Sequence, residues 1–128
     1  MAANGLDLDL LAASLRADAG DLQAFVEGLA IKLEEAVPGR VRVRRRRSAL
    51  MGPKRVRHIA LDAGDRRLEL MFDGGAPETY CSRLSGGIVL KRETLDTDAW
   101  LTAVGGALSA EARRSEITRQ ALERLLIR

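Results

Sequence analysis

The middle of the chain contains extended stretches joined by very short connections, and this feature most restricts the folds open to it. Turn-forming clusters lie at 63–65 and 73–77. Each is far shorter than the dozen or more residues that a crossover between parallel strands requires. The sequence therefore predicts an antiparallel meander over residues 40–94, with extended stretches at 40–47, 55–62, 66–72 and 79–94. Gly86-Gly87 inside the last stretch predicts a bulge or a division into two strands, so we expect four or five strands.

Helical periodicity flanks this segment on both sides. Before it, apolar residues recur three, four or seven positions apart over residues 7–37, and Gly20 allows a break into two helices. After it, a second helical pattern covers residues 97–127 and begins near Asp96 or Thr97. We therefore predict a single α+β domain over residues 1–128, in which the long C-terminal helix packs on one face of the sheet.

A continuous helix over 97–127 would be longer than the domain is wide. About 30 residues at 1.5 Å each give roughly 45 Å, whereas a domain of this size is about 30 Å across. Unless Gly105-Gly106 breaks the helix, its C-terminal end projects from the body. Exposed apolar residues on a projecting helix favour a second subunit. We therefore predict a homodimer whose subunit interface contains Ile117, Leu122, Leu125 and Leu126.

The net charge of +3 is distributed very unevenly along the chain. Residues 1–39 carry seven acids and two bases, residues 40–57 carry nine bases and no acid, and residues 58–128 carry eleven acids and ten bases. The basic character therefore belongs to one segment, which reads RVRVRRRR at its start and KRVR at its end. Such a segment suits an external anion, and the acidic N-terminal segment equally suits it as an internal or intersubunit partner.

If these two basic stretches form adjacent strands, both strands turn basic at the same end. Val41 and Val43 of one strand, with Ile59 and Leu61 of the other, then face the core. The sequence predicts a projecting cationic hairpin with an apolar tip at 48–53. Its candidate contacts with nucleic acid or another anionic surface are Arg42, Arg44, Arg45, Arg46, Arg47, Lys54, Arg55 and Arg57.

Three interpretations of this hairpin stay open. Charges on edge strands discourage unwanted strand pairing, and no aromatic residue alternates with the arginines, so we rank a solvated or internally paired face first. Nucleic acid ranks second, because cationic ribbons with an apolar tip are typical of architectural DNA-binding proteins. An anionic membrane surface or an acidic protein ranks third.

The sequence carries no recognisable catalytic motif. His58 is the only histidine and has no assigned nucleophile or orienting carboxylate. Cys81 is the only cysteine, which excludes an intramolecular disulfide and a thiolate metal cluster. Turn geometry explains the carboxylates near the predicted hairpin ends, namely Asp62, Asp65, Glu69 and Asp73. We predict no catalytic residue, metal ligand or cofactor, and a small hydrolase that uses His58 or these carboxylates is the weakest alternative.

The favoured function is a non-catalytic interaction or assembly module, a homodimer that binds a protein partner. The alternative is a nucleic-acid-binding protein that uses the hairpin over 40–57. The arrangement is similar, in layout alone, to that of several small dimeric bacterial proteins, including nucleoid-associated proteins and secretion chaperones. The N-terminus lacks the basic start of a secretory signal, and no apolar run approaches the roughly 18 residues that span a bilayer. We therefore expect no transmembrane segment and a cytoplasmic location.

Overall fold

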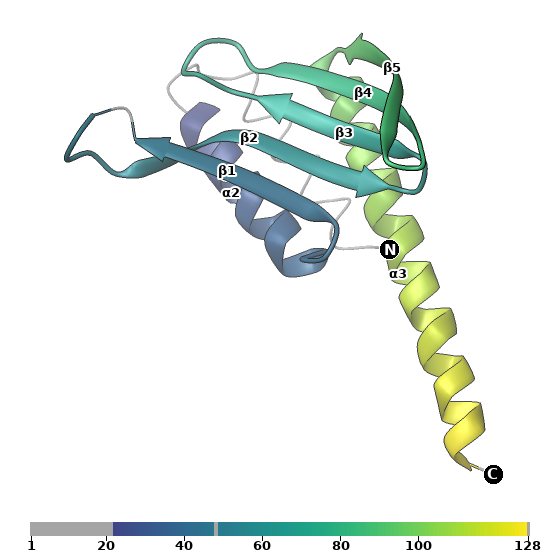
Figure 1. Cartoon of the computed structure of the whole chain (residues 1–128). Coiled ribbons are helices and arrows are strands. Elements are labelled where there is room, and N and C mark those ends of the chain that lie inside the picture. The colour runs from purple at the N-terminus through teal and green to yellow at the C-terminus, as the bar shows by residue number, and fades with distance from the viewer. Residues whose placement is uncertain (1–21, 48, 128) are drawn as a thin grey trace.

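The computed structural model describes residues 22–47 and 49–127, which form two helices and a five-stranded sheet (Figure 1). The elements in chain order are α2 (Leu22–Ala36), β1 (Val41–Arg47), β2 (Lys54–Ala63), β3 (Arg66–Met71), β4 (Glu78–Ser85), β5 (Ile88–Leu95) and α3 (Thr97–Ile127). The predicted α+β architecture is confirmed. The part of the predicted N-terminal helix that precedes Leu22, including the break near Gly20, lies outside the described residues.

The strands form one antiparallel sheet in chain order, β1-β2-β3-β4-β5. Gly86 and Gly87 form the turn between β4 and β5, so the sheet has five strands and not four. Both glycines have positive φ angles, 57° and 82°. Glycine adopts this backbone conformation without the steric penalty that other residues meet, which explains its place at a tight turn.

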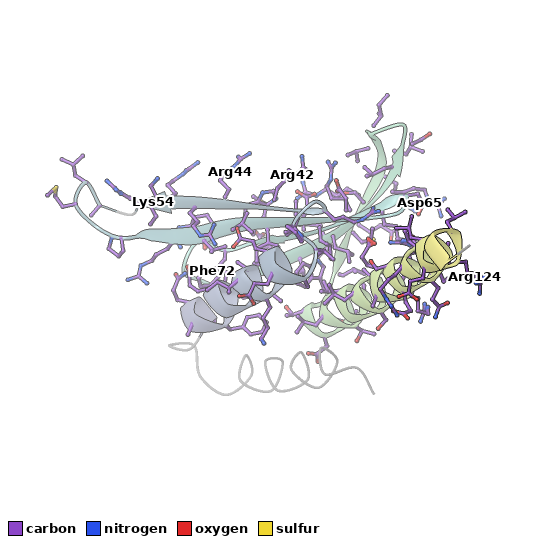
Figure 2. The ribbon with its side chains drawn as sticks, turned by 90° about the horizontal axis from the view of Figure 1, so that it is seen from below. Arg42, Arg44, Lys54, Asp65, Phe72 and Arg124 are labelled. Carbon is purple, nitrogen blue, oxygen red and sulfur yellow. The ribbon has the colours of Figure 1, made fainter. Side chains whose placement is uncertain are left out.

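Both helices cover the same face of the sheet (Figures 1 and 2). Helix α2 contacts β1 and β2, and helix α3 contacts β3 and β4. The core lies between the helices and the sheet, and its largest fully buried side chains include Trp100, Leu29, Leu33, Ile59 and Leu70. No helix among the described residues covers the opposite face, so the polar side chains of that face meet solvent.

A β-bulge in β2 changes which residues face the helices. Arg44 of β1 pairs with His58, whereas the next residue, Arg45, pairs with Val56, so Arg57 is the extra residue of β2. Because one extra residue reverses the alternation of faces, Val56 and Ile59 both point to the core and are 0% exposed. The amide of Val56 donates a hydrogen bond of 2.7 Å to Oε2 of Glu27 on α2. A helix carboxylate thus satisfies a buried strand amide beside the bulge.

Helix α3 is continuous through Gly105-Gly106. It begins after Asp96, whose Oδ1 accepts a hydrogen bond of 2.8 Å from the amide of Ala99, as an N-cap residue does. The first half packs on the sheet, and from Ala112 to Leu125 every side chain is exposed. The predicted projecting end is therefore confirmed (Figure 1).

No helix within the described residues combines the length and the apolar composition needed to cross a bilayer.

Candidate functional site

The β1–β2 hairpin extends past the end of α2, as Figure 1 shows. Its last paired residues are Arg46 with Arg55 and Arg47 with Lys54, so both strands are basic at the same end. At the tip, Leu50 is 90% exposed and Met51 is 93% exposed. The predicted projecting ribbon with a solvent-exposed apolar tip is therefore present in the structure.

Among the described residues, three cations of the segment form ion pairs. Arg45 donates to Glu34 of α2 at 2.7 Å and 3.2 Å, a two-bond contact that lowers the pKa of the Glu34 carboxyl. Arg40 pairs with Glu111 of α3, and Arg42 lies 3.9 Å from Asp62. The partners of these three cations are carboxylates of α2, α3 and β2, and no described carboxylate pairs with the cations beyond Arg45.

Five exposed cations of the hairpin form no ion pair in the described part of the chain, four of them beyond Arg45 and one, Arg44, just before it. They are Arg44, Arg46, Arg47, Lys54 and Arg55, all of them exposed. Of the eight predicted contact residues, Arg45 forms an ion pair at 2.7 Å and Arg42 forms a longer one at 3.9 Å. Internal pairing therefore accounts for part of the charge, and the exposure of the other cations is compatible with a solvated face, the other half of the first-ranked interpretation, as well as with an external anion.

These cations lie on both faces of the ribbon. Arg44 and Arg46 share the face turned away from the helices, and Figure 2 shows Arg44 beside Arg42 on that side. Arg55 pairs with Arg46 and lies on the same face, whereas the Arg47–Lys54 pair lies on the other face. The ribbon is therefore cationic on both sides and along its length.

A cleft of 480 Å³ lies on the uncovered face of the sheet, next to the hairpin. A row of directly paired residues crosses it on four strands, Arg44, His58, Met71 and Glu78. The other lining residues are Arg46, Arg57, Glu69, Phe72, Asp73 and Arg92. A second depression of 330 Å³ shares Arg44, His58 and Glu69 with it.

The pair of His58 and Glu69 lies in both depressions. Nε2 of His58 is 2.8 Å from Oε2 of Glu69, and the side chains are 22% and 18% exposed. The contact gives His58 the carboxylate partner that the sequence alone did not indicate. The strand register reveals this partner. A tight turn at Gly64-Asp65 pairs Ala60 with Glu69, and Glu69 is therefore the diagonal neighbour of His58 on the same face of the sheet.

The turn carboxylates do not gather into one site. Asp62 accepts a hydrogen bond of 2.8 Å from Nε of Arg67, and Glu69 contacts His58, while Asp73 lies at the opposite end of β3 from Asp65. No group of three or more metal-ligating side chains occurs among the described residues. Cys81 is half-buried in β4, as its predicted strand position implied.

The predicted subunit contact lies on the projecting end of α3. Ile117 is 65% exposed, Leu122 is 54% exposed and Leu125 is 70% exposed, and the side chain of Leu126 lies outside the described set. Arg119 pairs with Glu116 and with Glu123 along the same helix. These contacts between successive turns support a helix that no other described element covers.

Comparison of the chain with known protein families, with curated proteins and with solved structures found no match.

Proposed function

We propose that this protein is a non-catalytic nucleic-acid-binding module whose β1–β2 hairpin contacts the phosphate backbone of a duplex. The observation that carries the proposal is the group of five exposed hairpin cations that have no acidic partner in the described chain: Arg44, Arg46, Arg47, Lys54 and Arg55. Like charges held this close on a narrow ribbon repel one another, so an external polyanion would stabilise the arrangement.

The distribution of these charges favours a groove over a flat surface. A ribbon with cations on both faces can meet phosphates on both sides when it lies in a groove, and the major groove admits a two-stranded ribbon. An anionic membrane would engage one face and leave the Arg47–Lys54 pair or the Arg46–Arg55 pair in water. The exposed tip residues, Leu50 and Met51, are of the kind that architectural proteins insert between base steps.

The proposal is tested with a variant that removes hairpin charge without touching the cleft. Arg47→Ser, Lys54→Ser and Arg55→Ser together should weaken binding to a fluorescent DNA duplex by at least tenfold at low salt, since phosphate contacts supply most of non-specific affinity. The matched control replaces Arg83, Arg113 and Arg124 by Ser, which changes the net charge equally at exposed sites. Equal loss in both variants, or tighter binding to anionic vesicles than to DNA, would contradict the proposal.

A homodimeric assembly role is the second candidate, and it is compatible with the first. The observation that favours it is the projecting end of α3, which presents Ile117, Leu122 and Leu125 to solvent on a helix that no described element covers. Burial of such residues against a second copy would remove apolar surface from water at about 25 cal/mol per Å². A dimeric module could also present two hairpins to one duplex, which would raise its apparent affinity.

Light scattering tests this second candidate. The chain should have twice its 13.9 kDa monomer mass at tens of micromolar, and Leu122→Glu with Leu125→Glu should return it to the monomer mass. Glu substitutions at Arg113 and Thr118, which are exposed positions of the same helix, provide the control and should leave the dimer intact. A wild-type chain that is already monomeric would exclude the candidate.

A further inference from the structure

The cleft on the uncovered face of the sheet has a basic side formed by β1 and β2. Arg44 and Arg46 line this side and form no ion pair in the described chain, and Arg57 of the bulge joins them. The Nη1 atom of Arg57 is buried and has no hydrogen-bond partner among the described residues. A buried guanidinium N–H without an acceptor is costly, and because Arg57 also lines the cleft, an anion bound there would give this guanidinium an acceptor once the side chain turns toward it.

The opposite side of the cleft is acidic. Glu78, at the start of β4, is exposed and forms no ion pair within the described residues. Asp73 follows β3, and its Oδ1 accepts a hydrogen bond of 3.2 Å from the amide of Gly75, which leaves its other oxygen free of any bond to the described chain. Carboxylates in this position can accept hydrogen bonds from amino groups of a ligand.

The floor between the two sides holds the His58–Glu69 pair, the side chain of Met71 and one further cation, Arg92, whose Nη2 lies 3.8 Å from Sδ of Met71. The carboxylate of Glu69 is occupied by His58, and the guanidinium of Arg92 lies 3.8 Å from the centre of the Tyr80 ring. Met71, which is 40% exposed, supplies an apolar surface in the middle of the row. The row from β1 to β4 spans three strand spacings, about 14 Å.

We infer that this cleft binds a nucleotide whose base carries an exocyclic amino group, such as cytosine. The phosphate lies against Arg44, Arg46 and Arg57, the sugar and base cross His58 and Met71, and the amino group donates to Glu78 and Asp73. The cationic side at Arg44, Arg46 and Arg57 and the anionic side at Glu78 and Asp73 match the two ends of such a ligand, and between them Met71 and the guanidinium of Arg92 offer an apolar surface and a cation to the face of the base. A carboxylate that accepts from the amino group of cytosine is an established mode of base recognition.

The inference extends the proposed nucleic-acid binding but does not depend on the hairpin tip, because Arg47, Lys54 and Arg55 do not line the cleft. The nucleotide can be a free mononucleotide or an unpaired unit of a single strand, and both present the same phosphate, sugar and base.

Titration calorimetry with cytidine monophosphate and uridine monophosphate tests the inference on the whole chain. The two probes differ at one position of the base, where cytosine has an amino donor and uracil a carbonyl acceptor. Cytidine monophosphate should bind about tenfold more tightly than uridine monophosphate and than inorganic phosphate. Arg57→Gln, or Arg44→Gln at an exposed position, should weaken the binding of both nucleotides by about tenfold. Asp73→Ala with Glu78→Ala should reduce the preference for cytidine to within twofold.

The control is the hairpin variant with Arg47, Lys54 and Arg55 changed to Ser. Its affinity for the mononucleotide should stay within twofold, while its affinity for the duplex falls at least tenfold. Loss of duplex binding with retained nucleotide binding would thus overturn neither proposal. Absent nucleotide binding, equal affinity for the two nucleotides, or unchanged affinity in Arg57→Gln would overturn the inference whatever the duplex result. Oligocytidylate distinguishes the two sources, since competition by the strand identifies an unpaired unit and no competition identifies a free nucleotide.

Discussion

The hydrogen bond between Glu27 and the buried amide of Val56 should be one of the main links between α2 and the sheet. Glu27→Ala removes the acceptor of this hydrogen bond, and Val56 is 0% exposed, so water reaches the amide poorly. A buried donor left without a partner costs about 1–3 kcal/mol. The variant should therefore lower the unfolding free energy by about 2 kcal/mol and the melting temperature by about 6–10 °C.

Urea denaturation followed by circular dichroism measures this change. Glu35→Ala provides the control, because Glu35 is an exposed glutamate on the same helix and the substitution should change the unfolding free energy by less than about 0.5 kcal/mol. Glu27→Gln retains an oxygen acceptor and should lie between the two. If Glu27→Ala is no less stable than Glu35→Ala, the Glu27 carboxylate does not stabilise the bulge, and its hydrogen bond to Val56 does not help to fix the register of β2.

Two further changes test local features of the fold. The contact with Arg45 lowers the pKa of Glu34, so its stabilising contribution is complete above the ordinary glutamate pKa of 4.5 and is lost as the pH falls through the lowered pKa of the folded state. Glu34→Gln should therefore make the unfolding free energy depend less steeply on pH below about 4.5, by under about 1 kcal/mol in total because the pair is partly exposed. Gly64 has a φ of 63° in the β2–β3 turn, and Gly64→Ala should lower the unfolding free energy by about 1 kcal/mol, whereas Gly39→Ala, at a glycine without positive φ, should not, as measured by thermal melting.

Much of the fold could be predicted from periodicity and turn chemistry. The connection at 63–65 is too short for anything but an antiparallel hairpin, and the helical pattern over 97–127 indicates one long helix. The continuity of α3 through Gly105-Gly106 could not be predicted, because a glycine costs a helix only about 1 kcal/mol and the packing of Trp100 on the sheet outweighs that cost.

The bulge at Arg57 is the main feature of the fold that could not be predicted from the sequence. A strict alternation puts Val56 and Ile59 on opposite faces, and only the extra residue brings both into the core. Because the bulge is stabilised by Glu27, a residue far away in the sequence, local patterns do not reveal it. The cleft could not be predicted for a related reason, since its charged residues come from all five strands and meet only through the register.

The salt dependence of duplex binding tests the central proposal most directly. If the five exposed hairpin cations without an ion pair among the described residues each contact one phosphate, the logarithm of the association constant should fall with the logarithm of salt concentration with a slope of about −4.5, at about −0.9 per phosphate. Replacing Arg47, Lys54 and Arg55 by Ser should reduce the slope to about −1.8. Absence of binding at low salt, or an unchanged slope in this variant, would contradict a phosphate-binding role for the hairpin.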